Sequence, residues 1–211
     1  MRRNRPVMFR RKESLIFDAA PSIGPSGFYI IDPVHSTIGF SVRHAVKSDV
    51  RGEFTAFEGL IKLGRVRAAR SEAYISVQTG SVDTGWPERD AWLTGPDFLD
   101  SATFPLISFR STGIIDTGDD RSRMAGHLRI KDVELPVHVD LEFRGASRDA
   151  NGDDRVEFRG TATLQRADWG LDGSPRPATS GVLLGGKVKL LLDISAVRRN
   201  LTRRSPSQRG T

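Results

Sequence analysis

Apolar and polar residues alternate with period two along most of the middle of this chain. The clearest runs are residues 37–43, 72–77, 107–110, 123–130, 137–143, 156–164 and 187–194. Because successive side chains of a strand point to opposite faces, this period predicts antiparallel strands with one apolar and one wet face. No long helical pattern separates the runs, so they favour a meander that closes into a barrel or stacks as a sandwich.

Two long connections interrupt the alternation. In residues 80–105, Pro87 is followed by acidic residues and predicts the start of a short helix, which Gly95 ends. This connection also carries the large apolar residues Trp86, Trp92, Leu93, Phe98, Leu99 and Phe104. So many large apolar groups outside a strand must be buried, and a helical plug across one barrel mouth is the economical arrangement. The second connection, residues 165–186, is rich in Gly, Pro and Ser.

Basic residues gather at the two ends of the 211-residue chain. Residues 1–27 carry six Lys or Arg against two acidic residues, and residues 198–211 carry five Arg, so the net charge of +6 hides a weakly acidic middle. We expect one folded domain over residues 28–197, flanked by a flexible basic N-terminal tail (1–27) and a flexible Arg-rich C-terminal tail (198–211). Nucleic acid is not an expected partner, because no basic stripe follows the predicted strands.

The chain contains no Cys, which excludes disulfides, thiol nucleophiles and thiolate metal sites. The N-terminal arginines precede no long apolar run, since the apolar residues 15–17 are followed at once by Asp18. A secretion signal needs a longer apolar stretch, and no run approaches transmembrane length. We therefore expect a cytoplasmic protein without stable membrane insertion; Met8 is an alternative start.

Asp32, His35 and Ser36 are the residue types of a hydrolytic triad, but they lack its arrangement. His35 and Ser36 are adjacent, so in a strand they point to opposite faces. We interpret them as turn-stabilising residues, and predict no catalytic residue and no enzyme activity. His127 and His138 lie on neighbouring predicted strands, where two imidazoles lack the further ligands of a zinc site. We predict surface histidines and no metal.

Short motifs occur in a fixed order along the middle of the chain. They are D-P-V-H-S-T-I-G-F-S-V-R-H (32–44), G-E-F-T-A-F-E-G (52–59), S-V-D-T with R-D, D-F-L-D and F-P-L-I-S-F (81–109), G-H-L-R-I (126–130) and R-A-D-W-G (166–170). No single motif is specific, but their order and gaps together are. Over about residues 28–197 the chain resembles the YceI-like family of polyisoprenoid-binding, lipocalin-like proteins.

The resemblance implies an all-β fold, a single extended antiparallel lipocalin-like β-barrel of about eight strands with a short helical segment near 86–100. It also implies non-catalytic binding of a long-chain isoprenoid lipid in the barrel cavity, for sequestration, transport or delivery. The lipid is a polyprenyl chain, a polyprenyl phosphate or an isoprenoid quinone, and no other cofactor is expected. An accessory or enzymatic role in isoprenoid-quinone metabolism, an interaction module with a filled barrel, and a homodimer remain open alternatives.

The expected ligand-binding residues combine inward strand positions, large side chains of the first connection and polar groups near the mouth. They are Phe40, Val42, Phe54, Phe57, Ile75, Val77, Trp92, Leu93, Phe98, Phe109, Phe158, Arg89, Arg166 and Asp168. The phenylalanines could instead simply fill the barrel. Gly39, Gly126 and Gly160 favour a cavity, because missing side chains let strands bend or a ligand approach.

The polar members of this set have two interpretations. Arg89 with Asp90, and Arg166 with Asp168, either form ion pairs that fix the long loops or belong to a polar collar at the cavity mouth. A collar would offer forked guanidinium groups to a quinone carbonyl or a phosphate. Trp92 stands where the family usually has His, which alters the polar lining or narrows the mouth.

Overall fold

A computed structural model of the chain describes residues 26–44, 49–64, 71–149, 152–171 and 184–199. Its elements are β1 (Gly27–Ile31), β2 (Thr37–His44), β3 (Val50–Phe54), β4 (Phe57–Leu63), β5 (Glu72–Gln78), η2 (Thr79–Ser81), β6 (Val82–Asp83), α1 (Pro87–Thr94), β7 (Leu106–Gly118), β8 (Arg121–Ile130), β9 (Val133–Arg148), β10 (Asp154–Gln165), η3 (Arg166–Trp169) and β11 (Leu184–Arg198). The strands extend the predicted folded part by one residue at each end. Most of the two predicted tails lies outside the described residues.

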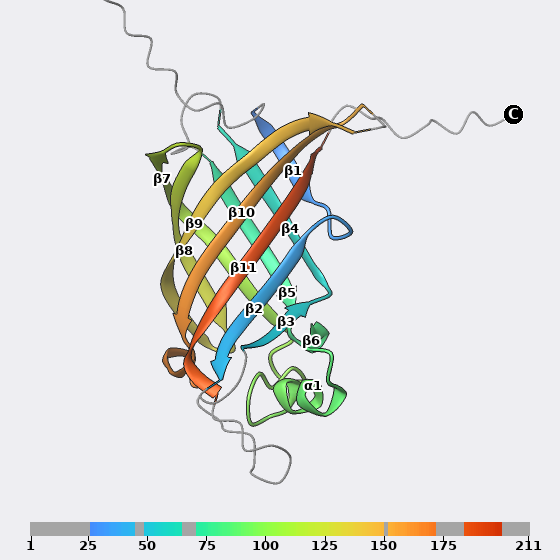
Figure 1. Cartoon of the computed structure of the whole chain (residues 1–211), viewed down its shortest axis with the longest axis vertical. Coiled ribbons are helices and arrows are strands. Elements are labelled where there is room, and N and C mark those ends of the chain that lie inside the picture. The colour runs from blue at the N-terminus through green and yellow to red at the C-terminus, as the bar shows by residue number, and fades with distance from the viewer. Residues whose placement is uncertain (1–25, 45–48, 65–70, 150–151, 172–183, 200–211) are drawn as a thin grey trace, which may run out of the picture.

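The sheet closes on itself because β11 has partners on both sides. One edge of β11 pairs with β10, while the other pairs first with β2 and then with β1. Thr37 lies opposite Asp193 and Ile31 lies opposite Ala196, so β1 and β2 act as one interrupted strand. β4 with β3, and β5 with β6, continue in the same way. The all-β prediction is confirmed as a closed eight-stranded antiparallel barrel (Figure 1).

The three interrupted strands break at neighbouring places, and hydroxyl side chains replace the missing backbone pairing there. The Ser36 hydroxyl donates to the Ser195 carbonyl at 3.0 Å and accepts from the Ser195 N–H at 2.9 Å. The Ser81 hydroxyl accepts from the Ala56 N–H at 3.0 Å, and Thr79 donates to the Phe104 carbonyl at 2.8 Å. The breaks therefore leave these backbone groups satisfied while changing the direction of the strands.

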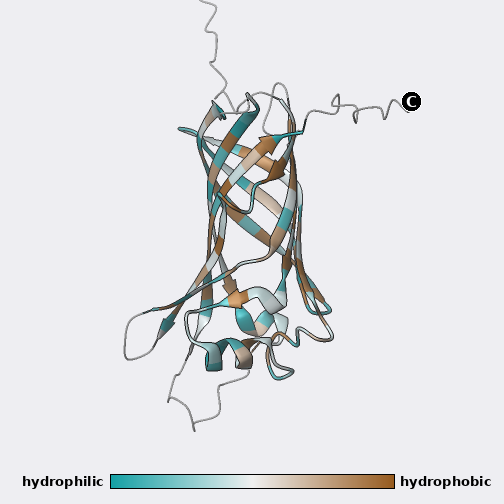
Figure 2. Ribbon diagram, turned by 90° about the vertical axis from the view of Figure 1, so that its right-hand side faces the viewer, coloured by the Kyte–Doolittle hydropathy of each residue, from teal (hydrophilic) through white to brown (hydrophobic). Residues whose placement is uncertain are grey.

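Beyond the breaks the barrel widens toward the end that carries α1 (Figure 2). Among the described pairings, β6 bonds to β3 but not to β7, so the wall is open between them. The segment after β6 covers this opening with α1, as predicted from Pro87 and Gly95 (Figure 1). The Gly95 N–H ends the helix by donating to the Trp92 carbonyl at 3.1 Å. Within the described residues, no helix is long and apolar enough to cross a bilayer.

The buried side chains form two clusters, one in each half of the barrel. The narrow half holds Tyr29, Ile31, Ile38, Leu63, Val77, Val156, Ile194 and Ala196. The wide half holds a larger cluster that includes Leu93, Phe98, Leu99, Phe109, Met124, Leu128, Leu164 and Trp169. Three members of the first cluster, Tyr29, Val156 and Ala196, are 0% exposed, so the barrel is tightly packed around them. A small pocket of about 40 Å³, whose lining includes Leu63, Phe143 and Phe158, borders this cluster.

Candidate ligand-binding site

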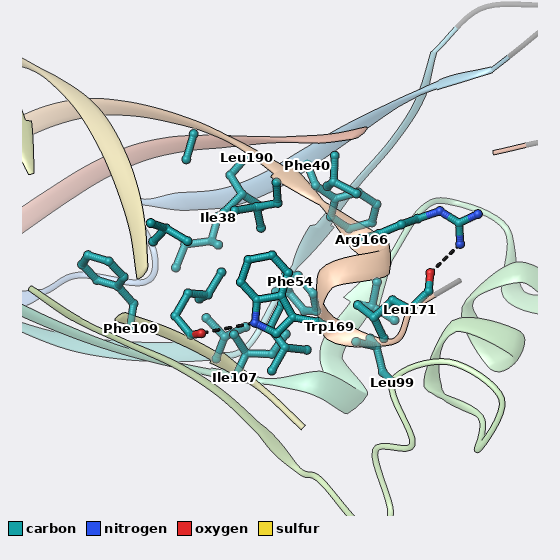
Figure 3. Close-up of a pocket in the computed structure, with 18 of the residues that line it drawn as sticks. Ile38, Phe40, Phe54, Leu99, Ile107, Phe109, Arg166, Trp169, Leu171 and Leu190 are labelled. Carbon is teal, nitrogen blue, oxygen red and sulfur yellow. Dashed lines mark hydrogen bonds between the residues drawn. The ribbon is translucent and has the colours of Figure 1, made fainter. Parts of the chain in front are cut away.

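An apolar cavity of about 170 Å³ occupies the wide half of the barrel (Figure 3). Inward residues of eight strands form its wall: Ile38, Phe40, Val42, Val50, Phe54, Ile75, Val77, Ile107, Phe109, Met124, Leu128, Ile130, Val137, Val139, Ala162, Leu164, Val188, Leu190 and Leu192, with Val82 from β6. The period-two alternation places them there, because every second side chain of each strand faces inward.

The two long connections supply the residues that cover the cavity. Leu93, Phe98 and Leu99 come from α1 and the loop after it, while Trp169 and Leu171 come from η3 and its C-terminal end. The Trp169 indole N–H donates to the Leu128 carbonyl at 3.3 Å. This bond satisfies the indole nitrogen, which is the one polar atom of the Trp169 side chain. The indole therefore adds apolar surface to the cavity.

Arg89 is held at the edge of the cavity by Thr84 and Trp86. Its Nε donates to the Thr84 hydroxyl at 2.7 Å, and one terminal nitrogen donates to the Thr84 carbonyl at 2.9 Å. Its guanidinium lies 5.4 Å from the centre of the Trp86 ring. Asp90 accepts from the Thr84 N–H at 3.0 Å. The two charged neighbours are therefore organised around Thr84, and no ion pair joins them among the described residues.

Arg166 lies at the other side of the cover, in η3. It is half-buried, it lines the cavity, and its guanidinium donates to the Leu171 carbonyl. Figure 3 shows this guanidinium directed away from the deep end of the cavity, which Phe109 marks. Arg89 and Arg166 are the charged residues of the described lining, which contains no carboxylate. The polar groups of the site are thus cationic and lie at its edge.

The structure places most of the predicted ligand-binding residues around this cavity. Phe40, Val42, Phe54, Ile75, Val77, Arg89, Leu93, Phe98, Phe109 and Arg166 line it. Their role in binding a ligand stays a prediction.

Four predicted residues do not line the cavity. Phe57 packs against the solid core of the narrow half, and so does Phe158, whose ring centre lies 5.4 Å from that of Phe143. Trp92 packs on Phe98 with ring centres 4.8 Å apart, behind the lining. Asp168 is exposed. Alternation identified the inward face for Phe57 and Phe158 but not the height along the barrel, which only the strand register determines.

The lining residues of β8, β9 and β11 were missing from the predicted site. Met124, Leu128, Val137, Val139 and Leu190 occupy the apolar positions of runs whose alternation was recognised. The signal that could have found them was therefore present, since the same face of each run must point into a closed barrel. The predicted site favoured aromatic residues and therefore omitted these aliphatic positions.

The glycines within the strands do not form the cavity, contrary to expectation. A Cβ at Gly126 would overlap the Phe109 ring and lie 2.6 Å from the Arg110 carbonyl oxygen. A Cβ at Gly160 would lie 3.1 Å from Leu192. Neighbouring side chains already fill these spaces, and a Cβ at Gly39 would meet backbone, 3.4 Å from the Gly52 carbonyl oxygen. At Gly126 and Gly160 the missing side chain instead makes room for large side chains of the neighbouring strands.

Comparison with known proteins assigns the fold and the motifs to one family. The YceI-like domain family matches residues 29–196, which is most of the chain. The chain belongs to the YceI-like family. A UPF0312 protein of Vibrio vulnificus is 33% identical over 155 residues, covering 72% of this chain and 82% of the relative. A UPF0312 protein of Azotobacter vinelandii is 30% identical over 173 residues, covering 81% and 87%.

Solved structures of YceI-like and related proteins share the barrel. BcnA of Burkholderia cenocepacia superposes with a TM-score of 0.69 at 20% identity, covering 78% of this chain and 98% of that one. A polyisoprenoid binding domain from Saccharophagus degradans, implicated in plant cell wall breakdown, superposes with a TM-score of 0.66 at 16% identity, covering 83% and 100%. At these identities the likeness establishes the fold.

The D-P-V-H-S motif of this YceI-like chain builds the first strand break. The Asp32 carboxylate contacts His35 Nδ1 at 2.8 Å and accepts from Arg155 at 2.9 Å. Burial alone would raise the pKa of Asp32, but the hydrogen bonds from Arg155 and His35 hold it below the ordinary value. Ser36 bonds to the Ser195 backbone and not to His35. This geometry agrees with the turn-stabilising interpretation and contains no nucleophile–base pair.

His127 and His138 lie on neighbouring strands, as predicted, but not directly opposite each other. His127 faces Pro136 across the ladder, and His138 faces Ala125. Both are exposed. Within the described ranges, no group of three or more His, Cys, Asp or Glu is placed to hold a metal ion.

Proposed function

We propose that this protein binds an isoprenoid-type lipid in the wide half of its barrel without changing it chemically, for sequestration, transport or delivery. The observation that carries the proposal is the apolar cavity of about 170 Å³, whose polar atoms lie at its edge. A dry apolar cavity favours a ligand of the same character, because each methylene moved out of water contributes about 0.8 kcal/mol. The structural likeness to a polyisoprenoid binding domain supports the isoprenoid class.

The mouth is suited to a polar end group. Arg89 and Arg166 bring two guanidinium groups to the edge of the cavity, from the two connections that cover it. A guanidinium donates forked hydrogen bonds to a phosphate or to a quinone carbonyl. We therefore place the ligand with its apolar part inside and its polar end between the two connections. The depth of the cavity limits how much of the isoprenoid chain can be buried.

Two rival functions predict different behaviour of the purified protein. An accessory or enzymatic protein of quinone metabolism would convert its bound quinone, so product formation distinguishes it from a carrier. An interaction module would hold no extractable lipid. Homodimerisation stays a prediction.

The decisive measurement is organic extraction of freshly purified full-length protein, followed by mass spectrometry. We expect an isoprenoid compound in near-stoichiometric amount. Phe40→Asp should abolish its retention, since a carboxylate inside the apolar wall is costly to bury. Ser41→Asp is the matched control, because Ser41 is the next residue of β2, does not line the cavity and faces Lys189 and Arg51 on the neighbouring strands. Lipid-free extracts, with no uptake of added prenol, would contradict the proposal.

A further inference from the structure

The cavity ends halfway along the barrel. Figure 3 shows Phe109 at one end of it and Arg166 at the other. Ile38 and Val77 belong both to the cavity wall and to the cluster of the narrow half, so the cavity borders that cluster. That cluster includes side chains with 0% exposure, such as Tyr29 and Val156. A chain entering from the α1 end therefore meets a closed floor.

The volume above this floor is small for a lipid site. An engineered apolar cavity of about 150 Å³ binds benzene, whereas sites for drug-sized ligands span roughly 300–1,000 Å³. At about 170 Å³, this cavity is close to the first value. It accommodates a short branched chain or one ring, and a long polyprenyl chain would leave most of its length outside.

Phe109 defines the floor because Gly126 lets its ring lie against β8. A side chain at Gly126 would overlap the ring and collide with the Arg110 carbonyl oxygen, so only glycine accommodates the ring in this position. Phe109 is itself 8% exposed and lies in β7, opposite Leu128 of β8. Phe109 and Gly126 lie on the paired strands β7 and β8 of the barrel wall, where side chains are held by close packing. The floor is therefore a fixed feature of the fold.

We propose that Phe109, laid over Gly126, acts with Ile38 and Val77 as a length stop that makes the protein selective for short isoprenoids. This inference rests on the proposed function and narrows it, because the family resemblance alone implies a long chain. Within the cavity, affinity rises about fourfold for each additional buried methylene. Once the chain reaches the floor, further units add nothing, because they stay in water.

The test is a binding series of geraniol, farnesol, geranylgeraniol and solanesol, delivered from cyclodextrin to delipidated full-length protein. Fluorescence of Trp169, which lines the cavity, reports occupancy. For the wild type we expect affinity to rise at the short end of the series and then level off. Phe109→Ala should move the plateau to longer prenols, and Phe109→Leu should do so less strongly.

Phe158→Ala and Phe158→Leu are the matched controls. Phe158 is also an inward phenylalanine, but it packs in the narrow half, outside the lining of this cavity, where it borders a separate pocket of about 40 Å³. Its replacement should leave the plateau unchanged. If the Ala variants do not fold, the Leu variants still allow Phe109 to be compared with Phe158. Thermal unfolding shows whether each variant is folded.

The outcomes separate this inference from the function on which it rests. A plateau that shifts in the Phe109 variants alone supports the length stop. Wild-type affinity that still rises up to solanesol would overturn it and leave isoprenoid binding intact. A plateau that Phe109 does not move would overturn the role of this residue. If none of the prenols binds, the proposed function fails, and the length stop fails with it.

Discussion

The two halves of this barrel share the same strands and the same alternation of residues, yet the pocket that borders the narrow-half cluster measures about 40 Å³ and the cavity of the wide half about 170 Å³. In the narrow half, β1, β4 and β5 pair continuously from β11 to β7, and the side chains inside reach 0% exposure. In the wide half the wall is open between β6 and β7, and the connections cover a cavity of about 170 Å³. Alternation therefore specifies which side chains face inward, but not whether they meet.

The difference originates in the breaks of three strands. At residues 32–36, 55–56 and 79–81 the backbone ladder is interrupted, and Ser36, Thr79 and Ser81 complete the hydrogen bonding with their hydroxyls. The wall can then diverge without leaving backbone groups unsatisfied. The residues of the two connections cover the widened end, and a cavity of about 170 Å³ remains beneath them.

The largest predicted effect comes from removing a fully buried side chain in the narrow half. Tyr29→Ala removes a side chain that is 0% exposed, and should cost about 3–5 kcal/mol of unfolding free energy, because the packed surroundings cannot close the hole. Phe40→Ala removes an aromatic ring that already borders a cavity, and should cost about half as much. Urea unfolding of the two variants measures the difference. Equal losses would mean that the halves are packed alike.

A second pair of variants adds volume instead of removing it. Ala196 lies in the narrow half at 0% exposure, so Ala196→Leu should destabilise the protein by about 1–3 kcal/mol through overpacking. Ala162 lines the cavity, so Ala162→Leu should stabilise it by about 0.5–1 kcal/mol while weakening prenol binding. Thermal unfolding and prenol titration are the measurements. Destabilisation by both substitutions would show that the cavity is not available space.

The third prediction concerns the break that separates the halves. Ser36→Ala leaves the Ser195 N–H and carbonyl without the partner they have at 2.9 and 3.0 Å, and should cost about 1–2 kcal/mol in urea unfolding. Ser41→Ala, in the strand β2 that follows the break but facing neither cavity nor break, should change stability by less than about 0.5 kcal/mol. The hypothesis that Ser36 maintains the break is wrong if both variants behave alike.

The sequence predicted the features that depend on neighbouring residues, and it missed those that depend on contacts between strands far apart in the chain. Strand faces, the helix at Pro87 and its position over a barrel mouth are local or nearest-neighbour properties, and all were predicted. The height of Phe57 and Phe158 along the barrel depends on register between strands far apart in sequence, which alternation does not encode. The roles of Gly126 and Gly160 depend on Phe109 and Leu192, which lie on neighbouring strands.

The smallest predicted effect is a pH dependence of the unfolding free energy, caused by Asp32 in the first strand break. The hydrogen bonds from Arg155 and His35 lower the pKa of Asp32 from its ordinary 3.8. A carboxylate with a lowered folded-state pKa contributes stability above the unfolded-state value, and this contribution disappears as pH falls through the folded-state pKa. Unfolding free energy should therefore decrease as pH falls below about 3.8, and Asp32→Asn should flatten that decrease. Asp193→Asn is the matched control, since its carboxylate pairs with Arg159 on the exposed outer face at 2.9 Å. Equal flattening by the two variants would mean that the acid sensitivity belongs to the barrel surface in general and not to the boundary between its narrow and wide halves.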